Sequence, residues 1–103
     1  MGYTTTLNYI VKANIPEAIR DLKPGKSFKI AKAGTRHYMM NCPLYLADPD
    51  WNIIGKCVVD QQSTANGFTA LECTLLVLFT PEESEIVTRL NRAGEQALSD
   101  LRK

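Results

Sequence analysis

The run from Phe68 to Phe79 constrains this chain most, because it is the most regular alternation in the sequence. Residues on one parity are apolar or threonine, and the run is rich in aromatic and branched side chains, which is typical of a β-strand. In its second half, from Leu75 onward, both faces are apolar. Such a strand is expected inside a sheet, or under a helix that covers its second face.

A helix is predicted directly after this strand. Thr80, Pro81 and Glu83 form a helix start, with an N-cap hydroxyl, a proline in the first turn and the glutamate of a capping box. Gly94 lies farther along, where it either lets the helix lie close to the sheet or ends one helix and starts another. An apolar stripe recurs at helical spacing, and we expect it to cover the sheet: Ile86, Val87, Leu90, Ala93, Ala97, Leu98 and Leu101.

Other strands are predicted upstream, over residues 3–12, 27–33, 36–47 and 52–60. Pro43 interrupts the third of these, which indicates an edge strand, a bulge, or two strands with a bend between them.

Glycine and aspartate mark the turns and irregularities. Gly55, inside a strand pattern, indicates a bulge or a close approach of two backbones. Asp48 and Asp50 flank a proline and predict a tight turn. Asn66 and Gly67 end a predicted loop over 61–67 and supply the positive φ that a hairpin needs.

These elements together predict a mainly β fold of the α+β class. We expect five or six strands in a small antiparallel sheet or half-open β-barrel, because short connections require antiparallel pairing. A short helix over 14–22 follows the first strand, and the C-terminal amphipathic helix packs on the sheet. A chain of 103 residues supports one core, so residues 1–103 are predicted to form a single domain. With neither a signal peptide nor a membrane span in the pattern, we expect a cytoplasmic protein that does not enter membranes.

The segment from Lys23 to Arg36 has an unusual local charge. It holds five cations and no acid, in a chain whose formal net charge is +1. Cations beside an aromatic residue bind phosphate backbones and stack on bases, so the segment is a candidate nucleic-acid or polyanion site. The alternative is that the lysines keep an edge strand soluble and unpaired. The candidate ligand-binding residues are Lys23, Lys26, Lys29, Lys32, Arg36 and Tyr38.

Apolar residues at a turn and along the last strand suggest an interaction surface. Trp51 follows the turn at Asp48–Asp50, where it either closes the end of a barrel or anchors an interface. With the exposed strand edges, the candidate interface residues are Trp51, Phe68, Leu76 and Leu78.

Catalytic chemistry has weak support in the sequence. The cysteines Cys42, Cys57 and Cys73 have no C-x-x-C spacing and predict reduced core thiols. A small cysteine-dependent enzyme would need Cys42 or Cys57 to be exposed with a lowered pKa. His37 is a poor base for Cys42, because residues five apart on a strand face opposite sides.

We therefore expect no catalytic residue, no metal and no cofactor. The sequence favours a non-catalytic binding module that associates with another protein or with itself. Binding of nucleic acid or another polyanion is the second hypothesis, and the cysteine-dependent enzyme is the third.

Overall fold

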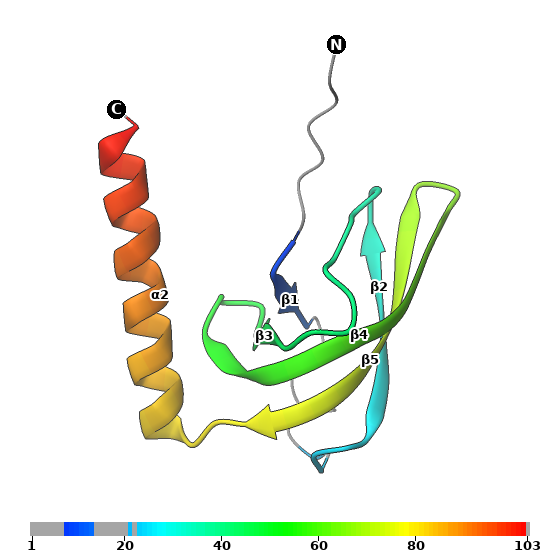
Figure 1. Ribbon diagram of the computed structural model, residues 1–103, viewed down its shortest axis with the longest axis horizontal. Helices are drawn as coiled ribbons and strands as arrows, with labels where there is room; N and C mark the ends of the chain where they lie inside the picture. Colours follow the sequence, from blue (N-terminus) through cyan, green and yellow to red (C-terminus); the bar gives the residue numbers. More distant parts are fainter. Residues whose placement is uncertain (1–7, 14–20, 22, 103) are drawn as a thin grey trace.

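The computed structural model describes residues 8–13, 21 and 23–102, and shows a curled half-barrel sheet with one C-terminal helix (Figure 1). The sheet order is β1-β3-β4-β5-β2, so β1 and β2 are its two edges and β5 is an interior strand. The predicted α+β, mainly β class is confirmed, with five strands. The elements in chain order are β1 (Ile10–Lys12), β2 (Ser27–Ala33), β3 (Leu44–Ala47), β4 (Ile53–Ala65), β5 (Phe68–Leu78) and α2 (Pro81–Leu101).

Two segments of the prediction extend beyond what is described. The helix expected over 14–22 lies almost wholly outside the described residues, as does the first part of the strand expected over 3–12. Within the described part of the chain, no helix is long and apolar enough to cross a membrane.

Strand pairing agrees with the antiparallel prediction at three of the four ladders. β2 pairs with β5, β3 with β4 and β4 with β5, all antiparallel. The fourth differs, because β1 pairs with β3 in parallel. The chain between β1 and β3 is long enough to include all of β2, and a connection of that length allows a parallel crossover. Short connections require antiparallel pairing, but this long connection does not.

The strand expected over 36–47 is much shorter in the structure. β3 begins at Leu44, directly after Pro43, and only Tyr38 of the earlier residues makes a bridge, to Asn8. Conversely, β4 runs on to Ala65 through most of the predicted 61–67 loop.

The hairpin from β4 to β5 turns at Asn66 and Gly67 as predicted, with φ values of 55° and 79°. Two positive φ values in succession give a two-residue turn whose twist matches that of the strands.

Two bulges in the β4–β5 ladder decide which side chains face the core. Lys56 pairs with Val77 and Cys57 pairs with Leu75, so Leu76 is an extra residue in β5. Before this extra residue, the odd-numbered residues of β5, such as Leu75, face the core. After it, the even-numbered Leu78 packs against the core instead. Asp60 is the corresponding extra residue in β4.

Gly55 lies where β4 approaches the backbone of β5 most closely. A Cβ atom there would overlap the carbonyl oxygen of Val77. The predicted close approach at this glycine is therefore confirmed.

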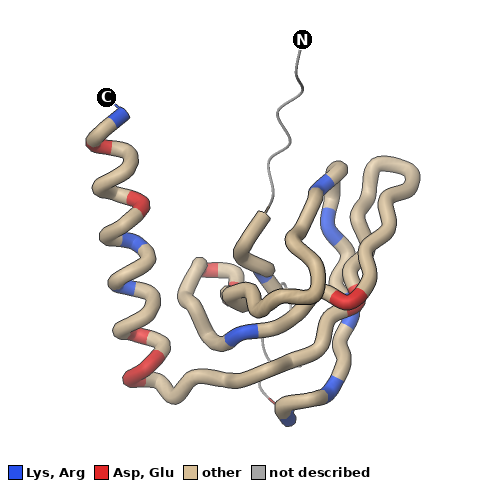
Figure 2. Tube along the Cα trace, viewed as in Figure 1, with Lys and Arg blue, Asp and Glu red and all other residues tan. Residues whose placement is uncertain are grey.

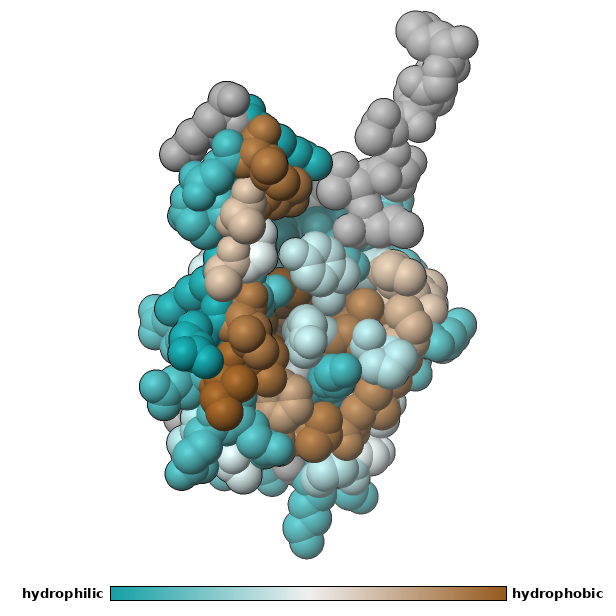
Figure 3. Space-filling view, turned by 60° about the vertical axis from the view of Figure 1, so that its left-hand side comes forward, coloured by the Kyte–Doolittle hydropathy of each residue, from teal (hydrophilic) through white to brown (hydrophobic). Residues whose placement is uncertain are grey.

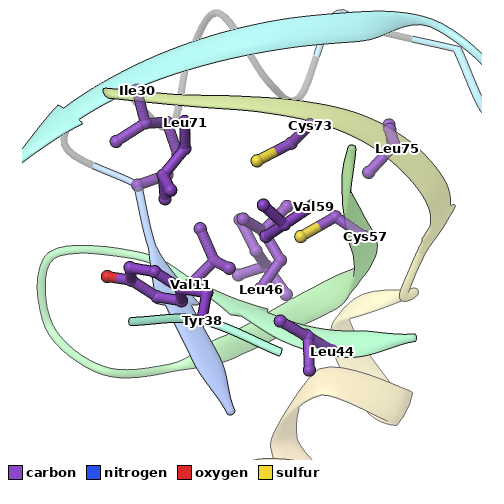
Figure 4. Packing of buried hydrophobic residues seen from close by; sticks show 12 residues of the cluster. Val11, Ile30, Tyr38, Leu44, Leu46, Cys57, Val59, Leu71, Cys73 and Leu75 are labelled. Atoms are coloured by element: carbon purple, nitrogen blue, oxygen red, sulfur yellow. The ribbon is translucent and has the colours of Figure 1, made fainter. Parts of the chain in front are cut away.

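The core occupies the concave side of the sheet and draws on all five strands (Figure 4). Cys57 and Cys73 are fully buried and point into the same cluster as Leu46 and Val59. Cys42 is partly buried and packs against this cluster. The prediction of core thiols is confirmed for the two buried cysteines.

Helix α2 begins as predicted and is continuous through Gly94. The Thr80 hydroxyl accepts a hydrogen bond from the backbone N–H of Glu83 at 3.2 Å, and the Thr80 N–H donates to the Glu83 carboxylate at 2.9 Å. Gly94 neither touches the sheet nor ends the helix, since nothing lies within 4 Å of where its Cβ would be.

A polar contact joins the helix to the sheet. The Thr88 hydroxyl accepts a hydrogen bond from the backbone N–H of Ile53 at 2.8 Å. One turn earlier, the Ser84 hydroxyl donates to the Ile53 carbonyl oxygen at 2.6 Å. Both backbone groups at the start of β4 are thus satisfied by the helix, and Thr88 is the buried residue of α2.

Candidate functional site

The apolar stripe of α2 faces solvent. At 3.6 residues per turn, its centre lies roughly 135° around the helix axis from Ser84 and Thr88, which face the sheet. Four of its large side chains keep much of their surface exposed: Ile86 51%, Leu90 62%, Leu98 47% and Leu101 83%. The helix packs on the sheet as predicted, and Val87 is half-buried, but the expectation that the stripe covers the sheet is wrong for these four side chains. Two hydroxyl contacts to one backbone position set the rotation of the helix, and they turn the stripe outward.

The stripe has small residues in its middle and large ones at both ends. We call Ile86, Leu90, Ala93, Gly94, Ala97, Leu98 and Leu101 the α2 stripe. Figure 3 shows it as a line of brown and tan surface along the length of the helix. A second helix can approach closely at Ala93, Gly94 and Ala97, where no long side chain separates the two backbones.

The sheet also keeps apolar surface exposed, because α2 packs mainly against β4 and not over β5. Leu76 and Val77 are exposed near the end of β5. The predicted cover over the second face of β5 is therefore missing at these residues.

A groove of about 880 Å³ separates the helix from the sheet. Arg92 crosses to the other wall, where its guanidinium donates to the Asp50 carbonyl oxygen at 3.3 Å. Asp48 is buried, and its carboxylate accepts hydrogen bonds from the backbone N–H groups of Asp50 at 3.0 Å and Asn52 at 2.8 Å. The predicted turn-forming role of Asp48 is confirmed, and its carboxylate is already occupied.

The four predicted interface residues do not form one surface. Trp51 is exposed in the β3–β4 turn at a φ of 66°, with the Lys12 ammonium 4.8 Å from the centre of its ring. Phe68 is exposed beside the β4–β5 hairpin turn, and Leu76 is exposed at the β5 bulge. Leu78 is partly buried against the core. The α2 stripe, which the sequence pattern had assigned to the core, is the larger apolar surface.

The predicted basic residues are divided by the alternation of β2. Lys29 lies opposite Glu72 in the β2–β5 ladder and is exposed, whereas Lys32 is buried on the same face as Ile30. Lys23 and Lys26 are exposed before the strand begins. Figure 2 shows these cations spread along β2 rather than gathered at one point.

Arg36, one of the predicted ligand-binding residues, lies near Lys32, because its backbone N–H donates to the hydroxyl of Thr69, which is opposite Lys32 in the β2–β5 ladder. After burial, the charge of Arg36 and then that of Lys12, a cation that the sequence analysis missed, lower the pKa of the Lys32 ammonium group. Tyr38 is buried beside Arg36, and burial raises the pKa of its hydroxyl while the guanidinium opposes part of the rise. The local sequence does not indicate that the charge of Lys12 acts on Lys32, because the two residues lie on the opposite edge strands β1 and β2.

Cys57, one of the two cysteines considered for catalysis, is placed unfavourably for it. Cys57 is buried, and the neighbouring Cys73 thiol and burial raise the pKa of the Cys57 thiol, so it does not meet the requirement for a nucleophile. Among the described His, Cys, Asp and Glu residues, no three gather in a way that would hold a metal ion.

The fold belongs to the class of small α+β half-barrels with a C-terminal helix. Among solved structures, it is similar to the X-ray crystal structure of protein ytmB from Bacillus subtilis, with a TM-score of 0.60. The two chains are 21% identical, and the similarity covers 79% of this chain and 98% of that one. At this identity the likeness concerns the fold alone. No family model matches the sequence, and no curated protein matches it.

Proposed function

We propose that this protein is a non-catalytic association module that forms a dimer through the α2 stripe. The observation that carries the proposal is the orientation of α2, which binds the sheet through Ser84 and Thr88 and leaves its apolar side in solvent. An apolar face of this length on a helix is typical of an interaction surface.

The exposed apolar surface is large enough to support association. In each copy, the exposed fractions of Ile86, Leu90, Leu98 and Leu101 add up to more than two complete side chains. Burying an Ile or Leu completely contributes about 1.5–3 kcal/mol, so two copies contribute about 7–15 kcal/mol. Association costs about 4–15 kcal/mol in lost freedom of motion. Because the two ranges overlap, we expect a dimer that dissociates on dilution.

A second copy of α2 fits the stripe when the two helices run antiparallel. Pairing about Ala93 and Gly94 brings Ile86 against Leu101 of the other copy and Leu90 against Ala97. Small residues thus meet at the centre, and a large residue meets a small one beside it.

Charge also favours the antiparallel arrangement. The first turn of α2 carries Glu82 and Glu83, and Arg102 follows the last turn. In an antiparallel pair, Arg102 of each helix lies near the acidic first turn of the other, and the helix dipoles oppose each other favourably.

Sedimentation equilibrium over micromolar to millimolar concentrations tests this proposal. We expect the wild-type mass to move from monomer to dimer with rising concentration, and Leu90→Glu to stay monomeric with an unchanged far-UV spectrum. Ser99→Glu adds the same charge to an exposed helix position outside the α2 stripe, and this control should dimerise like the wild type.

Two results would overturn the proposal. One is a wild-type protein that stays monomeric throughout. The other is a dimer that survives Leu90→Glu but is lost in Leu76→Glu, which would place the interface on the sheet.

A further inference from the structure

A second site, independent of the α2 stripe, lies near the end of the edge strand β2. Lys32 is the next-to-last residue of this strand, and the loop that follows carries Arg36. The Lys12 ammonium, from the other edge strand, lies 4.8 Å from the centre of the Trp51 ring and is not part of this site.

Lys32 is 6% exposed, and lysines this buried are rare unless they are paired. It shares the inward face of β2 with Ile30, and its position in the ladder is opposite the buried Thr69. No described residue makes a hydrogen bond or an ion pair with its ammonium group. Since no described side-chain nitrogen is both fully enclosed and without a partner, this group retains an opening to solvent.

The charges around Lys32 are positive. Burial first, and then Arg36 and Lys12, lower the pKa of its ammonium group. Burial and neighbouring like charges disfavour the charged form of this group, and functional sites are where such arrangements concentrate. Among the described residues no carboxylate pairs with this ammonium, and a bound anion would balance its charge.

Arg36 is held in place by a short network that includes Thr69. The Arg36 backbone N–H donates to the Thr69 hydroxyl at 2.9 Å, and this hydroxyl donates to the Gly34 carbonyl oxygen at 2.8 Å. The Gly34 N–H donates to the Gly67 carbonyl oxygen at 2.6 Å. The Arg36 side chain is oriented by its Nε, which donates to the Ala33 carbonyl oxygen at 3.1 Å.

This network also excludes one way of binding an anion. Two backbone N–H groups of the loop, those of Gly34 and Arg36, already have acceptors. An anion here would therefore be bound by side chains, not by the backbone amides that form a phosphate loop at the start of a helix.

We propose that Lys32 and Arg36 form a binding site for a single phosphoryl group, carried by free phosphate or by a small phosphate ester. A phosphoryl dianion balances the charge of these two cations, and its oxygens suit the planar fork of an arginine. The Tyr38 hydroxyl lies beside Arg36 and adds a polar wall.

The geometry favours a single phosphoryl group over a nucleic-acid strand. A strand needs a track of cations along its backbone. Here Lys29 lies opposite Glu72 on the exposed side of β2, and Lys23 and Lys26 lie beyond the other end of the strand. The five cations of the Lys23–Arg36 segment therefore do not form a continuous row, and only Lys32 among the lysines is buried.

Calorimetric titration and thermal unfolding with inorganic phosphate, at an ionic strength held constant with chloride, test the site. Phosphate should bind the wild type and raise its Tm more than chloride does. Lys32→Met should weaken binding by about tenfold or more, because a charge-assisted hydrogen bond is lost. Lys29→Met is the matched control and should bind within about twofold of the wild type.

The same variant gives a second readout in the absence of any ligand. Lys32→Met removes a charge that partial burial and neighbouring cations disfavour, and should raise the Tm of the ligand-free protein. A lysine that only supports the fold would produce the opposite shift.

Two further ligands distinguish the sources of the phosphoryl group. Ribose 5-phosphate, with ribose as its control, tests a phosphate ester: tighter binding than inorganic phosphate would identify an ester, and equal binding would identify the free anion. A single-stranded oligonucleotide without terminal phosphates tests the polyanion hypothesis.

The proposal is overturned if phosphate has no effect beyond that of chloride, or if Lys32→Met binds as tightly as the wild type. It is also overturned if the oligonucleotide binds more tightly than both phosphates and Lys23→Met weakens it as much as Lys32→Met. Leu90→Glu, the monomeric variant, should bind phosphate normally, so this site and the proposed dimer fail or succeed separately.

Discussion

The contact between Thr88 and Ile53 is the most direct test of how α2 is oriented. Thr88→Val preserves the branched shape of the side chain and removes the hydroxyl that accepts the Ile53 N–H at 2.8 Å. That N–H is then left without an acceptor in a buried place, which costs about 1–3 kcal/mol. Ser84 still holds the Ile53 carbonyl oxygen, so we expect the helix to loosen rather than to detach.

The expected change in thermal stability follows from the length of the chain. The entropy of unfolding is about 2.1 cal/mol/K per residue, so for a chain of this size a loss of about 2 kcal/mol lowers the Tm by about 9 °C. Thr88→Ser keeps the hydroxyl and should recover most of this loss. Comparisons must be made at one protein concentration, because association stabilises the folded state.

Amide hydrogen exchange locates the effect. The Ile53 amide should be protected in the wild type and in Thr88→Ser, and should exchange faster in Thr88→Val. If Thr88→Val has the wild-type Tm and Ile53 remains protected, the hydroxyl does not set the rotation of α2. The physical reason for the exposed α2 stripe would then be lost.

Two further predictions concern the core. Gly55→Ala should lower the free energy of unfolding by about 3 kcal/mol in urea titrations, because its Cβ would overlap the backbone of β5 at Val77. The same change at Gly94, which has open space around it, should stabilise the protein slightly. Equal effects at the two glycines would refute this account. In iodoacetamide labelling at pH 8 followed by mass spectrometry, Cys42 should react well before Cys57, because Cys57 is buried and burial and its thiol neighbour raise its pKa; labelling of Cys57 at the rate of Cys42 in the folded protein would contradict this.

The features that the sequence predicted correctly are local ones. The strand Ser27–Ala33, the capping box of Thr80 and Glu83, and the turn at Asn66 and Gly67 all depend on residues within a few positions of one another. Alternation and helical spacing are properties of one element, so they can be recognised without knowing its neighbours.

The phase of the strands was harder to predict, because a bulge leaves no reliable mark in an alternating pattern. Leu76 and Leu78 share a parity in the sequence, but the extra residue at Leu76 leaves one of them in solvent and the other against the core. The pairing partner across the ladder decides where the extra residue is inserted.

The sequence by itself determined that the chain forms a small α+β half-barrel with a capped amphipathic helix. Tertiary structure alone decided which face of that helix meets the sheet, because the hydroxyls of Ser84 and Thr88 form hydrogen bonds with the backbone of Ile53, more than thirty residues away in the sequence. It also decided which lysine of β2 is buried, because the curled sheet places its core on the side of Ile30 and Lys32 and leaves Lys29 exposed opposite Glu72. An amphipathic pattern indicates that one face of a helix is apolar. What packs against that face depends on contacts between residues that are far apart in the sequence.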